Sequence, residues 1–195
     1  MVRPETLIPR PSIFLAILGG LVGMLLLGAL IYLAPVFGFP FIDFPLLIGG
    51  LFTPNPDVAL WLGFWLFFLV GVFLFAPLLA FFWASLPGRN IGFSGAAVKG
   101  LVWGFILWIL SGLLLPLLGF LNRIDGLGNP GLFGLNAGFI APLGSLLGHL
   151  AFSLATALIA AMGQGIEPID TLGWNGYHHA DVRPAILKRE ERDVL

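Results

Sequence analysis

Four long apolar runs, separated by short stretches rich in proline, glycine and charge, dominate the chain. They cover residues 13–35, 58–85, 97–120 and 142–163. Each reaches the roughly 20 residues that an α-helix needs to cross a hydrocarbon core about 30 Å thick. The pattern predicts an all-α integral membrane protein. Residues 1–163 would form a bundle of four transmembrane helices, and residues 164–195 a short cytoplasmic tail.

Residues near the ends of the runs predict where the helices start and where they bend. Ser12 and Asp57 are placed to cap the first and second helices, because their side-chain oxygens can accept from unpaired backbone N–H groups. Pro142 suits the first turn of the fourth helix, where its missing N–H costs nothing. Pro77 and Pro116 fall inside runs two and three, so we expect both helices to bend there.

The basic residues are distributed unevenly between the two sides of the predicted bundle. With four spans, the N-terminus, the loop after span two and the C-terminus share one side, which carries eight of the nine Lys and Arg residues. The other side has only Arg123. Loops rich in Lys and Arg stay in the cytoplasm. We therefore expect both termini in the cytoplasm and the protein in the inner (plasma) membrane of a bacterium.

The first outer connection, residues 37–56, is unusual because it reads FGFPFIDFPLLIGGLFTPNP. It is too apolar for a loop in water and too interrupted by proline for a fifth span. We expect an interfacial loop that lies at the membrane surface or packs over the bundle. A re-entrant segment, or one that covers a ligand, is the alternative.

Composition excludes several function classes. Only 10% of the 195 residues are charged and the net charge is −1, so the chain offers no basic surface for nucleic acid. It contains no cysteine, which removes disulfides, thiolate metal sites and cysteine nucleophiles. The predicted spans also lack nucleophile–base pairs and metal-ligand clusters. We therefore expect a protein that is not catalytic by itself.

Small residues predict which helix is most enclosed, because close backbone approach drives packing in lipid. In span four they recur at every fourth position, which places them on one helix face. This row contains Ala141, Ser145, His149, Ser153, Ala157 and Ala161, and an adjoining row contains Gly144, Gly148, Ala151 and Ala155. Span two is instead rich in Trp and Phe. We expect span four at the centre and span two as a wall that faces lipid or a partner.

His149 is the one ionisable side chain well inside a predicted span, and such residues are functional candidates. It could be a neutral histidine that hydrogen-bonds Ser145, Ser153 or a neighbouring carbonyl. It could also ligate a haem iron or the magnesium of a chlorophyll-type pigment, or handle a proton or polar substrate. Lys99 lies at the predicted cytoplasmic start of span three, where we expect its amine to snorkel to the interface.

Span four and its approach carry the glycine-rich sequences GLFGLN, residues 131–136, and GSLLGH, residues 144–149. In these motifs the chain resembles small uncharacterised bacterial four-span membrane proteins with a Gly-rich last helix that bears Gly-His. The resemblance covers about a fifth of the chain. It implies a compact helical bundle and no particular chemistry.

Many bulky aromatics, apolar outer connections and little polarity at mid-span favour an accessory role. We expect a non-catalytic subunit of a larger bacterial membrane complex of respiratory or photosynthetic electron transfer. Its partners would be the lipid bilayer with bound lipids, other integral membrane subunits, and a cytoplasmic protein that docks on the tail, residues 164–195. The alternatives are a small transporter or channel subunit, and a haem- or pigment-binding protein that uses His149 alone.

Overall fold

The computed structural model describes residues 11–38, 40 and 42–164, and all regular structure in this part of the chain is helical. Four helical stretches are long and apolar enough to cross a membrane: Ile13–Phe37, Pro56–Phe81, Gly92–Leu121 and Ala141–Gln164. This confirms the predicted number of long apolar helices. The predicted tail lies outside the described residues, apart from Gln164.

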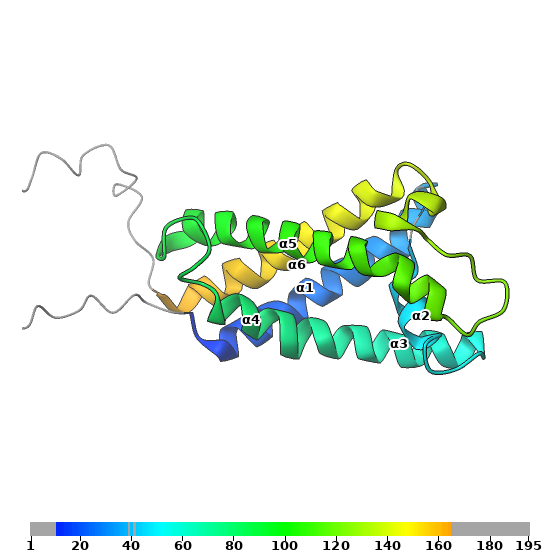
Figure 1. Ribbon diagram of the computed structural model, residues 1–195. Coiled ribbons are helices and arrows are strands. Elements are labelled where there is room, and N and C mark those ends of the chain that lie inside the picture. Colours follow the sequence, from blue (N-terminus) through cyan, green and yellow to red (C-terminus); the bar gives the residue numbers. More distant parts are fainter. Residues whose placement is uncertain (1–10, 39, 41, 165–195) are drawn as a thin grey trace, which may run out of the picture. The chain divides into compact units, whose positions relative to one another are not determined.

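In the described part of the chain, four long helices and six short ones follow one another, and Figure 1 shows the long ones lying side by side. The long helices are α1 (Ile13–Leu33), α3 (Pro56–Val70), α5 (Gly92–Leu121) and α6 (Ala141–Ala161). The short ones are η1 (Ala34–Phe37), α2 (Phe44–Gly49), η2 (Gly71–Phe75), α4 (Ala76–Phe81), η3 (Leu132–Ala137) and η4 (Met162–Gln164). We call the end of the bundle that holds η1, α2 and η3 the η1–η3 end, and the opposite end the α4–α5 end.

The second stretch changes from an α-helix to a π-helical turn just before its proline. The π-helical turn η2 separates α3 from α4 and places Pro77 in the first turn of α4. A proline there needs no N–H donor, so the wide turn accommodates it without breaking the helix. The helix ends at Phe81 rather than at residue 85 as predicted. The following turn points the carbonyl groups of Trp83 and Leu86 inward instead of along a helix axis.

The amine of Lys99 donates hydrogen bonds to these two carbonyls. The expectation that it snorkels to the interface was therefore wrong. Helix α5 begins at Gly92, five residues before the predicted start of the span, so Lys99 lies about two turns beyond its first residue. The side chain is fully buried. Its Nζ donates to the carbonyl oxygens of Trp83 at 2.7 Å and Leu86 at 2.6 Å, and lies 5.6 Å from the centre of the Trp83 ring. Lysine stays inside because the loop supplies the acceptors that water would otherwise provide.

Two predicted helix caps also differ. Asn55, not Asp57, caps α3, and its Oδ1 accepts from the N–H groups of Asp57 at 3.0 Å and Val58 at 3.1 Å. Asp57 sits inside the first turn, where its negative charge still favours the helix N-terminus. Ser12 occupies the cap position of α1, but its side chain makes no capping hydrogen bond.

Helix α6 is the most enclosed of the long helices, as the sequence predicts. In its most apolar stretch 44% of residues are buried, against 28–33% in the other three. It packs between α1 and α5 at glycines whose partners are backbone atoms. A Cβ on Gly23 of α1 would lie 2.5 Å from the Phe152 carbonyl oxygen, and one on Gly104 of α5 would lie 2.7 Å from that of His149. These contacts depend on the absence of side chains.

Within the connection of residues 37–56, α2 packs along α3 (Figure 1), which agrees with a segment that packs over the bundle. A Cβ on Gly49 or on Gly63 would overlap the carbonyl oxygens of Ala59 or Pro45, so the two backbones are in direct contact. Near its C-terminal end, α2 is hydrogen-bonded to the residue that follows α5. There the Asn122 side chain donates to the Leu47 carbonyl at 3.0 Å.

Candidate functional site: a cavity between α1 and α6

The close contact between α1 and α6 ends before the η1–η3 end of the bundle. Its last glycine contact joins Gly148 to the side chain of Leu27. One turn earlier on α6, a Cβ on Gly144 would have no neighbouring atom within 4 Å. From this point the two helices separate and leave a cavity of about 490 Å³.

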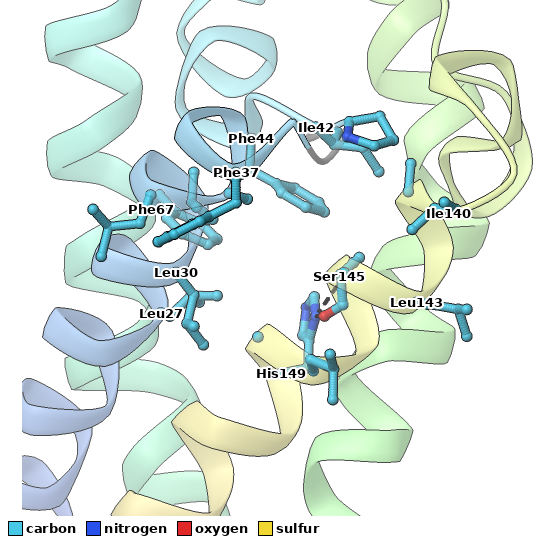
Figure 2. A pocket seen from close by; sticks show the side chains of 18 residues that line it. Leu27, Leu30, Phe37, Ile42, Phe44, Phe67, Ile140, Leu143, Ser145 and His149 are labelled. Atoms are coloured by element: carbon cyan, nitrogen blue, oxygen red, sulfur yellow. Dashed lines mark hydrogen bonds between the residues drawn. The ribbon is translucent and has the colours of Figure 1, made fainter.

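Eighteen residues line the cavity, and they are apolar except for Ser145 and His149 (Figure 2). Leu27 and Leu30 of α1 and Phe37 of η1 form one side. Ser145 and His149 of α6 face them from the other side. Ile42 and Phe44, from the connection of residues 37–56, line a further side of the cavity, which stays partly open, while Phe67 comes from α3. The lining therefore combines a large hydrocarbon surface with one small polar patch, as small-molecule sites do.

The polar patch is organised by His149, which is buried, with 8% of the residue exposed. Its Nδ1 lies 2.7 Å from the carbonyl oxygen of Ser145. A carbonyl can only accept, so Nδ1 carries a hydrogen and donates it. Nε2 lies 3.1 Å from the Ser111 hydroxyl of α5. In a neutral ring Nε2 is then the acceptor, and Ser111 donates to it.

Ser111 extends this connection back into its own helix. Its Oγ is also 3.0 Å from the carbonyl oxygen of Trp108, one turn earlier on α5. The single hydroxyl hydrogen can serve either Nε2 or that carbonyl. If His149 gains a proton, Nε2 donates to Ser111 and Ser111 donates to Trp108, so both charge states fit the same atom positions. The histidine thus links α6 to α5 by hydrogen bonds.

The geometry bears on the predicted role of His149 as a ligand of haem or of a pigment. The expected hydrogen bond to Ser145 is present, through the carbonyl group, and the partner on α5 is Ser111 rather than Ser153 of the same helix. Both ring nitrogens therefore have protein partners. An iron or magnesium could be bound at Nε2 only after the hydrogen bond to Ser111 is broken.

Ser145 presents a hydroxyl group to the cavity. Its Oγ is 3.5 Å from Nδ1 of His149, the longest hydrogen-bond contact in this patch. Because the Nδ1 hydrogen already goes to the Ser145 carbonyl, Nδ1 has no lone pair to accept from Oγ. The hydroxyl hydrogen is consequently available to a molecule in the cavity.

Asp43 lies between the lining residues Ile42 and Phe44 and positions the wall of the cavity. It caps α2 by accepting from the Leu46 N–H at 2.8 Å. Burial raises the pKa of its carboxyl group above the ordinary range, and the hydrogen bond from Leu46 opposes that rise. The cap orients Phe44, whose ring stacks on Phe67 at 5.8 Å and meets the His149 ring edge-on at 6.0 Å.

The sequence points to His149 and Ser145, but not to the cavity, to Phe44 as part of its wall, or to Ser111 as the partner of His149. No sequence signal pairs Ser111 with His149, because the two lie 38 residues apart on different helices. Phe44 belongs to the apolar connection, residues 37–56. A segment that covers a ligand is the alternative interpretation of this connection, and Phe44 lines the cavity. Gly144 was assigned to a row of helix contacts.

Comparisons with protein-family models, with curated proteins and with solved structures found no match.

Proposed function

We propose that this chain is a multi-pass membrane protein that holds an apolar, membrane-soluble molecule in the cavity between α1 and α6. We propose that it does so as a non-catalytic accessory subunit of a larger bacterial membrane assembly. The observation that carries the binding function is the cavity of about 490 Å³ with its almost entirely apolar lining. Its size falls within the range of known ligand sites, about 300–1,000 Å³.

The position of the cavity along the helices favours a lipid-soluble occupant. His149 is eight residues beyond Ala141, the first residue of α6, which at 1.5 Å per residue corresponds to a depth of ~12 Å. If α6 crosses a bilayer, this depth lies inside the hydrocarbon region. Water requires several polar partners to occupy a cavity, and this lining offers Ser145 and His149 alone. A hydrocarbon-rich molecule suits the remaining walls.

The accessory role is supported by the outer face of α3 and of the turns that follow it. Trp61, Trp65, Phe73 and Phe81 are all exposed there. Such large rings can contact lipid or the helices of another subunit. An electron-transfer complex, respiratory or photosynthetic, is the assembly expected from the sequence. Co-migration of the chain with redox subunits in mild detergent would support that host, whereas an isolated homo-oligomer would contradict it.

Two glycines allow a direct test of the cavity. Gly144 lines it, whereas Gly28 of α1 does not, and a Cβ at either position would meet no atom within 4 Å. We expect Gly144→Phe to occupy the cavity and to reduce the small molecules that co-purify with the protein, measured by mass spectrometry of solvent extracts. Gly28→Phe should leave them unchanged. Equal co-purification with both variants would contradict the binding function.

A haem or pigment held by His149 is the second candidate, because the histidine lines the same cavity. On this proposal the purified protein has a visible absorption band that His149→Gln abolishes, since an amide is a poor replacement for imidazole at iron or magnesium. The bonds from Nδ1 to Ser145 and from Nε2 to Ser111 favour the first proposal. A colourless preparation that still contains a co-purified lipid would decide for it.

A further inference from the structure

We infer that the cavity selects a molecule with a carbonyl group, and that this carbonyl accepts a hydrogen bond from the Ser145 hydroxyl. This inference rests on the proposed binding function and adds the chemistry by which the occupant is recognised. The donors of the polar patch differ in whether they already have a protein acceptor.

The other donors near the cavity are committed to protein acceptors. The Nδ1 hydrogen of His149 goes to the Ser145 carbonyl at 2.7 Å. Nε2 and the Ser111 hydroxyl pair with each other at 3.1 Å, and Ser111 also reaches the Trp108 carbonyl. The indole Nε1 of Trp108 donates to the Pro142 carbonyl at 3.1 Å.

Ser145 is different because its hydroxyl hydrogen has no strong acceptor in this network. Its contact with Nδ1 is 3.5 Å long, and that nitrogen already carries a hydrogen of its own. A hydroxyl without a partner in an apolar setting is unfavourable. An occupant that brings an acceptor to Oγ removes that cost, and one that brings only hydrocarbon does not.

The carbonyl group is the acceptor that this setting selects. A charged acceptor such as phosphate or carboxylate would be poorly placed, because apolar side chains make up the rest of the lining. Membrane-soluble molecules carry neutral carbonyls in two common forms, the ester groups of glycerolipids and the ring carbonyls of quinones. Both would place a carbonyl at Ser145 and a hydrocarbon chain between α1 and α6.

The test compares pairs of probes that differ in the carbonyl. One pair is a diester phosphatidylglycerol and its diether analogue. The other is a decyl-substituted benzoquinone and decylbenzene. Binding to the purified full-length chain in detergent is measured by native mass spectrometry. One neutral hydrogen bond corresponds to a preference of about 2- to 12-fold for the carbonyl member. We expect Ser145→Ala to remove the preference.

Ser153→Ala is the matched control, because Ser153 lies two turns further along α6 and does not line the cavity. It should leave the preference unchanged. A preference in only one pair identifies the source of the carbonyl as lipid or quinone. Equal binding within both pairs, or a preference that survives Ser145→Ala, would overturn the inference.

The two proposals fail in different ways. If Gly144→Phe weakens every probe while Ser145→Ala changes nothing, the cavity binds hydrocarbon and only the carbonyl selection is wrong. If Gly144→Phe has no effect on any probe, the binding function itself fails.

Discussion

Replacing Lys99 by methionine isolates the contribution of its buried amine. Methionine has a similar length and fills much of the same space, but it cannot donate hydrogen bonds. In the native protein Nζ holds the carbonyl oxygens of Trp83 and Leu86, at 2.7 Å and 2.6 Å. These two carbonyls lie in the turn between α4 and α5, and the substitution leaves them in place without their donor.

Two opposing effects determine the sign of the change. Removing an ammonium group from the interior relieves its desolvation penalty, and replacing a whole buried ion pair by apolar residues is often neutral or stabilising. Here, however, the partners are backbone carbonyls that no side-chain substitution can remove. Each buried carbonyl left unpaired costs about 1–3 kcal/mol. Two of them cost about 2–6 kcal/mol, so we expect destabilisation.

The assay is thermal unfolding of the purified protein in detergent, followed by tryptophan fluorescence. For a chain of this size 1 kcal/mol corresponds to roughly 2–4 °C in Tm, so even the lower end, about 2 kcal/mol, predicts a loss of about 4–8 °C. Val98→Met is the control, because Val98 is the exposed neighbour of Lys99 on α5. A Tm for Lys99→Met equal to that of Val98→Met would show that the lysine does not hold this turn.

Three further predictions concern His149, the connection of residues 37–56 and the orientation of the chain in the membrane. His149→Gln should retain a hydrogen bond and leave the assembly and any absorption spectrum unchanged, as checked by size-exclusion chromatography and spectroscopy. Gly63→Ala would drive a Cβ into the backbone of α2, so proteolysis of residues 38–55 should increase, while Gly28→Ala should have no effect. Reporter fusions after Arg89 and after Leu195 should both report cytoplasm, and a fusion within residues 126–129 the opposite side; a periplasmic C-terminus would refute the four-span topology.

The four long helices could be predicted from sequence because span length and apolar content are local properties. The same is true of the enclosure of α6, since a row of small residues acts within one helix, whereas Pro116 does not interrupt α5. Helix ends were less predictable. α4 ends at Phe81 because carbonyls of the next turn bind a side chain of α5, and that partner is sixteen residues away in sequence.

Lys99 was misjudged because the rule for lysines at helix ends assumes water or lipid headgroups as the only acceptors. The turn before α5 supplies two carbonyls and the Trp83 ring instead. The pairing of His149 with Ser111 is hidden for a similar reason. Several serines and carbonyls were possible partners, and the choice among them depends on how α5 and α6 cross.

The small residues of α6 explain why the cavity was not foreseen. A glycine removes volume, and the sequence does not say whether a neighbouring helix or a ligand takes that volume. Gly148 meets Leu27, whereas Gly144, four residues earlier on the same helix, meets nothing. Gly144 lies beside the cavity, which Ile42 and Phe44 of the connection, residues 37–56, line together with α1 and α6.

This connection is fixed by close packing, because the backbones of α2 and α3 are in contact at Gly49 and Gly63. The glycines that fix this connection therefore also fix one wall of the cavity, and loosening them should alter ligand binding as well as stability.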